Sequence, residues 1–117
     1  MINLIWVATG GAIGASLRHI NSNAIKYFYP NLPLNTLFVN IFGSFLIGLL
    51  MGYLENKNYS ENFVRYFLII GLLGSYTTFS TFSYEVIDLF NNRKFLISFF
   101  YILLSVCSCL FFAFLGF

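Results

Sequence analysis

A run of glycine, hydroxyl and aromatic residues from Gly71 to Glu85 is the part of this chain whose residue types and spacing could do chemistry. It reads GLLGSYTTFSTFSYE and lies in the middle of an apolar segment. Hydrocarbon offers no hydrogen bonds, so a polar group inside a bilayer must pair with protein or with water in a cavity. Such a run within a membrane segment indicates an ion site or a permeation pathway rather than a lipid-facing helix.

The first half of this run predicts a break in a helix. Gly71 and Gly74 are followed by the pair Thr77 and Thr78, and a helix interrupted there would release backbone carbonyls. Carbonyl oxygens coordinate small, hard cations. A cation site made of backbone rather than of side chains is therefore one interpretation of these residues.

The second half of the run predicts contacts to an anion. Phe79 and Phe82 are three residues apart, so they share one face of a resumed helix. The edge of a phenyl ring carries the positive part of its quadrupole and can contact an anion, although aromatic residues at this spacing are also typical of ordinary packing. Ser80 and Thr81 add hydroxyl donors beside the two rings.

Three charged or amide residues each leave two interpretations open. Asn40 lies well inside an apolar stretch, where its amide must be paired; its nitrogen could donate to an anion, or the side chain could join two helices. Arg18 is either a snorkelling anchor or a vestibule cation that attracts anions. Glu85 either pairs with Arg18 or binds a proton.

The last apolar stretch carries a short polar stripe. Tyr101 and Ser105 lie one helical turn apart, and Ser108 or Cys109 could extend the stripe. Cys107 and Cys109 are two residues apart, so on a helix they point to different faces and cannot bridge each other. With one histidine and no cluster of acidic or thiol ligands, we expect neither a zinc or iron site nor a catalytic nucleophile, and the protein is not expected to be an enzyme.

The elements that position these residues are predicted from composition. Hydrophobic residues make up 59% of the chain and charged residues 9%, which is far from the average of a soluble domain. Four apolar stretches have about the 20 residues that a membrane-spanning helix needs: residues 4–27, 34–54, 63–90 and 95–117. We therefore predict an all-α membrane protein with one integral membrane domain over residues 1–117. A net charge of +2 gives no reason to expect a nucleic-acid partner.

Small residues recur at helical spacing in the first two stretches. Such pairs let helix backbones approach closely in lipid, although single pairs are also simply tolerated in membrane helices. The pairs are Gly10 with Gly14, Gly11 with Ala15, and Gly48 with Gly52. They predict an intimate bundle, which 117 residues can hardly build alone around a pore.

The charges flanking the spans specify orientation poorly. Four basic residues fall on one side of the predicted topology and two on the other. The positive-inside rule then favours one orientation only weakly. Either the chain inserts in one orientation that the charges fail to indicate, or it inserts both ways and opposite copies pair about an axis in the membrane plane.

The whole pattern resembles one family, the Fluc/CrcB fluoride channels. The resemblance covers essentially the full chain in length and four-span layout, and it rests on three motifs. These are GGAIGASLR at residues 10–18, TLFVNIFGSF at residues 36–45, and the run from Gly74 to Glu85 with TTFSTF intact. Asn35 departs from the glycine that the family usually has before Thr-Leu, and Ser75–Tyr76 replaces a second small residue after Gly74.

The resemblance implies a function and a set of site residues. It implies a passive fluoride-selective channel in the bacterial inner membrane, built as an antiparallel dual-topology dimer of two copies with a broken third helix. Two fluoride pores would be lined by both copies, with Asn40, Phe79, Phe82, Tyr101 and Ser105 in the walls and Ser80 and Thr81 as candidate donors. Gly74 and Thr77 would present carbonyls to a structural sodium ion between the copies, and Arg18 would lie at the vestibule.

Three alternatives remain open on the sequence. The chain could be half of an obligate heterodimeric fluoride channel with an oppositely oriented paralogue. A small multidrug-type exporter also uses four short spans, but it needs a carboxylate in its first helix, and residues 4–27 contain none. A non-transporting assembly subunit would suit the glycines but leave Asn40 and the hydroxyl run without a role.

Overall fold

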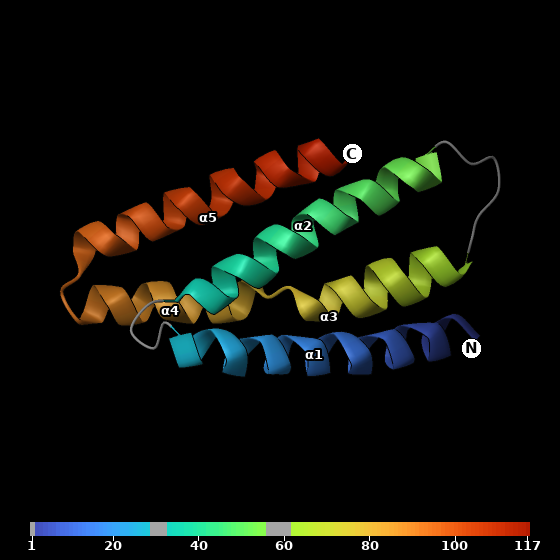
Figure 1. Cartoon of the computed structure of the whole chain (residues 1–117), viewed down its shortest axis with the longest axis horizontal. Coiled ribbons are helices and arrows are strands. Elements are labelled where there is room, and N and C mark those ends of the chain that lie inside the picture. Colours follow the sequence, from blue (N-terminus) through green and yellow to red (C-terminus); the bar gives the residue numbers. More distant parts are fainter. Residues whose placement is uncertain (1, 29–32, 56–61) are drawn as a thin grey trace.

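The computed structural model describes residues 2–28, 33–55 and 62–117, and every regular element in those ranges is a helix (Figure 1). The connections between the first and second and between the second and third predicted spans fall largely outside these ranges. The elements are α1 (Ile2–Phe28), α2 (Leu34–Glu55), η1 (Phe63–Leu73), α3 (Gly74–Tyr76), α4 (Phe79–Asn91) and α5 (Phe95–Gly116). The predicted all-helical class is confirmed, and η1 is wound as a π-helix, a form that proteins rarely use over more than one turn.

The helices form an elongated bundle measuring 50 × 26 × 23 Å. Figure 1 shows that α1 runs beside η1 and α3, whereas α2 crosses the bundle and lies along α5. Helix α4 continues the line of η1 and α3 beyond an interruption and packs on α5. The two sides of the bundle are therefore the α1–η1 pair and the α2–α5 pair.

Three helical segments of the described chain are long and apolar enough to cross a membrane: Leu34–Glu55, Phe63–Asn91 and Phe95–Gly116. They match the predicted spans at residues 34–54, 63–90 and 95–117. The predicted span at residues 4–27 is a helix but does not meet the same criteria. Arg18, Asn21, Asn23 and Lys26 make the last turns of α1 polar, which lowers its hydropathy.

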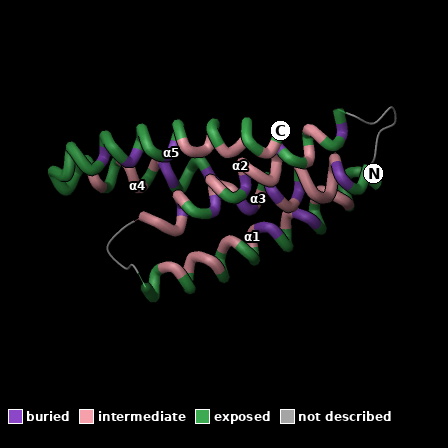
Figure 2. The backbone as a smooth tube through the Cα atoms, turned by 45° about the horizontal axis from the view of Figure 1, so that its top comes forward, coloured by how far each residue is buried: buried purple, intermediate pink, exposed green. Residues whose placement is uncertain are grey.

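Burial is confined to a thin seam between the helices. Figure 2 shows buried residues where helices meet and exposed residues along their outer sides. The buried apolar side chains are few, and Val39 on α2 is fully buried. Large apolar side chains on the outer faces remain exposed, as expected for helices whose outer faces contact lipid.

Glycines make the closest contacts in this seam. A methyl group added at Gly14 of α1 would overlap the Leu72 carbonyl, and one added at Gly10 would overlap the Phe67 carbonyl. On the other side of the bundle, a methyl group at Gly48 of α2 would overlap the Ala113 carbonyl of α5. The prediction that small residues bring backbones together is thus confirmed at both helix pairs. Gly11 is looser, since its nearest neighbour would be the Ser75 hydroxyl at 3.1 Å.

We expect Gly14→Ala to destabilise the protein relative to Gly11→Ala. Both changes raise helix propensity equally, but only the first forces a methyl group into a backbone carbonyl, and such overpacking costs about 1–3 kcal/mol. Unfolding in detergent, followed by circular dichroism against added sodium dodecyl sulfate, compares the two variants. Equal stability of the two would contradict the close α1–η1 contact.

Candidate functional site

The helical run after η1 is interrupted at Thr77 and Thr78. Thr77 has φ −85° and ψ 158°, and Thr78 has φ −151° and ψ 123°, so both residues are extended. Helix α3 ends at Tyr76 and α4 begins at Phe79. Backbone groups that a continuous helix would pair internally must therefore find other partners.

Asn40 supplies the partners for Thr78. The Thr78 amide donates to Asn40 Oδ1 at 2.8 Å, and Asn40 Nδ2 donates to the Thr78 carbonyl at 3.0 Å. The side-chain amide thus pairs with the backbone as a neighbouring β-strand would. These two bonds also determine which side-chain atom of the amide is nitrogen, because the Thr78 N–H can only donate a hydrogen bond and the Thr78 carbonyl can only accept one. One hydrogen of Nδ2 is left over for another acceptor.

Thr78 also caps the helix that follows. Its Oγ1 accepts a hydrogen bond from the Thr81 amide at 3.2 Å, which satisfies a donor in the first turn of α4. The same oxygen lies 3.2 Å from both Ser80 Oγ and Thr81 Oγ1. The sequence predicts Thr78 as part of the break but not as a site residue. Its position three residues before Thr81 is an N-cap signal that the sequence does contain.

The same two interactions release two backbone carbonyls. In a continuous helix the Thr78 amide would bond to the Gly74 carbonyl, and the Thr81 amide to the Thr77 carbonyl. Here the Thr78 amide donates to Asn40 Oδ1, and the Thr81 amide donates to the Thr78 hydroxyl oxygen. Gly74 is exposed and Thr77 is half-buried. Helix interruption therefore frees the two carbonyls that the resemblance to a family assigns to a cation.

A groove of about 330 Å³ lies beside the break. It brings together Asn40 from α2, Phe79 and Phe82 from α4 and Ser105 from α5, four of the predicted anion-contacting residues. The rings of Phe79 and Phe82 have centroids 5.4 Å apart. The remaining lining residues are Gly43, Ser44, Ile47, Thr77, Thr78, Val106, Cys109 and Leu110.

Ser105 is the least satisfied polar residue of the groove. Its side chain is 5% exposed, and its Oγ has no hydrogen-bond partner within the described part of the chain. A hydroxyl buried in this way costs free energy unless a further group binds it. Its hydroxyl is therefore a polar group at the groove that no described residue satisfies.

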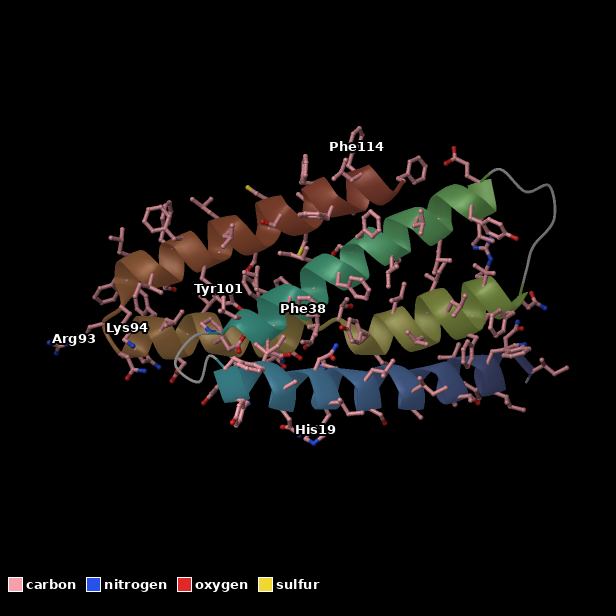
Figure 3. All side chains as sticks on the ribbon, viewed as in Figure 1. His19, Phe38, Arg93, Lys94, Tyr101 and Phe114 are labelled. Atoms are coloured by element: carbon pink, nitrogen blue, oxygen red, sulfur yellow. The ribbon has the colours of Figure 1, made fainter. Side chains whose placement is uncertain are left out.

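Tyr101 lies behind the groove rather than on its wall. Figure 3 shows its side chain reaching from α5 toward α4, where the Tyr101 hydroxyl donates to Glu85 Oε1 at 2.9 Å. Its ring centroid is 5.2 Å from that of Phe82. The partner of Glu85 in this structure is thus Tyr101, whereas the sequence left Arg18 or a proton as the possibilities. Ser98 adds a second link between α5 and α4 through the Val86 carbonyl.

A second recess, of about 240 Å³, approaches the break from the α1 side. Arg18, predicted at the vestibule, and Thr81, a predicted donor, both line it. Thr78 lines this recess as well as the groove, so it separates the two. Ser80, the other predicted donor, is exposed and lines neither.

Comparisons with known proteins cover almost the whole chain. Residues 5–117 match the family model described as "CrcB-like protein, Camphor Resistance (CrcB)". A Campylobacter jejuni protein named "Fluoride-specific ion channel FluC" is 46% identical over 119 residues, covering 100% of this chain and 97% of the relative. Proteins of the same name from Flavobacterium psychrophilum and Hydrogenobaculum sp. are 45% and 46% identical, over 91% and 86% of this chain and 86% and 83% of the relatives.

We expect Thr78→Val to lower stability by about 1 kcal/mol through loss of the helix cap. Valine keeps the shape and suits an extended backbone, but it has no oxygen to accept from the Thr81 amide. Thr78→Ser keeps the acceptor and is the matched control. Detergent unfolding of both variants gives the comparison, and a valine variant as stable as the serine variant would rule out the cap.

Proposed function

The chain belongs to the CrcB-like family, and we propose that it is a fluoride-selective ion channel of a bacterial cell membrane. The observation that carries the proposal is the groove that collects Asn40, Phe79, Phe82 and Ser105 around a helix break. It supplies neutral donors, and none of its lining residues is charged. That is the chemistry expected of a site that an anion must enter and also leave.

Fluoride is small and strongly hydrated, so the channel replaces its water with short-range donors. The free hydrogen of Asn40 Nδ2, the Ser105 hydroxyl and the ring edges of Phe79 and Phe82 serve this purpose. Asn40 has a double role, because its other hydrogen and its oxygen hold Thr78. Arg18 raises the local concentration of anions at the recess before they reach the break.

Export needs no energy source besides the membrane potential. Fluoride enters cells as neutral HF and dissociates inside. A negative interior drives the anion out with about 2.3 kcal/mol per charge for each 100 mV. A passive pore therefore lowers the toxic cytoplasmic concentration.

The working unit in this proposal is a dimer of two copies in opposite orientations. In each copy the four spans are those predicted, with α1 as the first and with the third broken in mid-membrane between α3 and α4. Phe79 is 73% exposed in one copy, although it lies on the groove. A second copy over this face encloses the groove, so each pore takes its walls from both copies. The weak charge bias between the two sides of the chain permits both orientations.

A sodium ion between the copies completes the proposal. The freed carbonyls of Gly74 and Thr77 fit it, because neutral backbone oxygens suit a small, hard cation and carry no charge that would trap it. Two copies about a twofold axis would double this donor set. When bound, such an ion would supply positive charge to the Gly74 and Thr77 carbonyls of both copies.

We expect liposomes that contain only this purified chain to release fluoride rapidly and to retain chloride. Asn40→Asp and Phe79→Ile should each reduce the efflux about tenfold or more, because the carboxylate repels the anion and isoleucine lacks a ring edge. Phe114→Ile is the control, since Phe114 is 79% exposed on α5 and projects outward from the bundle (Figure 3). Folded wild-type protein without efflux would reject the self-sufficient channel and point to a partner subunit.

We also expect sodium to stabilise the protein specifically. An ion that binds only the folded dimer raises its stability by about 2.7 kcal/mol at a concentration 100 times its dissociation constant. Melting temperatures measured in sodium chloride and in potassium chloride at equal ionic strength separate this effect from the screening of charges by salt. Identical melting temperatures across a sodium titration would remove the ion from the proposal.

A further inference from the structure

We propose that Tyr76 is a positioning residue for the cation site at the helix break, and that it acts through the hydrogen bond between its hydroxyl and Asn21 of α1. The bond fixes the last helical turn before the break, and with it the directions of the Gly74 and Thr77 carbonyls. This role rests on the proposed function, because the sodium ion is part of that proposal.

Tyr76 is the last helical residue before the break. Helix α3 ends with it, and Thr77 is extended. In chain order Tyr76 lies between Gly74 and Thr77, the two residues whose carbonyls lose their helical partners. Because peptide groups are planar, few torsions separate Tyr76 from either carbonyl. Fixing Tyr76 therefore limits the directions that both carbonyls can take.

Two neighbouring helices hold the Tyr76 side chain, which is only 5% exposed. Its hydroxyl oxygen accepts a hydrogen bond from Asn21 Nδ2 of α1, 55 positions away in the sequence. Its ring meets the Phe42 ring of α2 edge to face, with centroids 6.3 Å apart. A methyl group added at Gly43 of α2 would lie 3.6 Å from Tyr76 Cδ2, so the ring also packs against α2 at this glycine. Packing holds the ring in place, and the directional hydrogen bond fixes its far end on α1.

The two sides of the break are anchored to different helices. After Thr77, the backbone of Thr78 is bonded to Asn40 of α2. Before Thr77, the side chain of Tyr76 is bonded to Asn21 of α1. Thr77 thus has one anchored residue on each side. Without the bond to α1, the last turn of α3 would be held by ring packing alone and could rotate about its own axis.

A cation held by neutral carbonyl oxygens depends on the directions of those oxygens, because no charged ligand compensates for a misplaced one. A contact that holds the oxygens in the bound arrangement before the ion arrives lowers the cost of binding. A bond that serves the fold alone would stabilise the protein equally with and without sodium. A positioning bond changes the affinity for sodium as well, and this difference separates the two roles.

The test measures the dissociation constant of sodium on the full purified chain, without any transport assay. The constant is fitted to the rise of the melting temperature with sodium chloride, potassium chloride being used to keep the ionic strength equal. Tyr76→Phe keeps the ring and removes only the hydroxyl, and Asn21→Ala removes the donor. We expect each variant to bind sodium about fivefold more weakly, which is the size of effect that one hydrogen bond produces. The double variant should be no weaker than either single variant, because both lose the same bond.

Ser98→Ala is the matched control, because Ser98 Oγ of α5 donates to the Val86 carbonyl of α4 and its loss removes an interhelical hydrogen bond that does not involve α3. We expect this variant to melt lower in potassium and to keep the sodium dissociation constant of the wild type. The positioning role is overturned if Tyr76→Phe also keeps that constant, or if Ser98→Ala weakens sodium binding as much. A wild type whose melting temperature does not respond to sodium would instead reject the sodium site, and the role of Tyr76 with it.

Discussion

The pairing of the Asn40 amide with the backbone of Thr78 is the interaction on which the site depends. Inside a membrane a chain can leave the helical conformation only where its backbone groups are bonded to protein. Asn40 offers one donor and one acceptor in the geometry of a peptide group, so it stands in for a neighbouring strand. Extended residues at Thr77 and Thr78 are tolerated for that reason.

Several features follow from this one contact. Once Thr78 is extended, its hydroxyl can cap α4, and α4 restarts with Phe79 and Phe82 on the groove. The Gly74 and Thr77 carbonyls lose their helical partners at the same step. The structure thus links the wall of the groove and the carbonyls of Gly74 and Thr77 through two hydrogen bonds, and none of the residues that line the groove is charged.

The scaffold that holds this break is built on close backbone contact rather than on a large core. The hydrophobic effect does not drive helices together in lipid. Their association must therefore be driven by close packing and by interhelical hydrogen bonds. Gly10 and Gly14 allow α1 to pack closely on η1, and Gly48 does the same for α2 on α5. The Tyr101 hydroxyl of α5 donates a hydrogen bond to Glu85 of α4. Such contacts are short and directional, which suits a site whose donors must hold their positions.

The sequence by itself determined the helical class, the bounds of three apolar segments and the glycines that allow close approach, because hydropathy and helical spacing are local properties of the chain. It also singled out Asn40, whose amide is costly in an apolar segment, whereas Phe79, Phe82 and Ser105 are ordinary residues of membrane helices and became candidate site residues through the resemblance to a family. The tertiary structure alone decided their partners. Asn40 meets Thr78 across 38 positions of sequence, Glu85 meets Tyr101 and not Arg18, and Cys109 comes to line the groove. Spacing along one helix cannot indicate which face of another helix it will meet, and that pairing assigned each polar group its role.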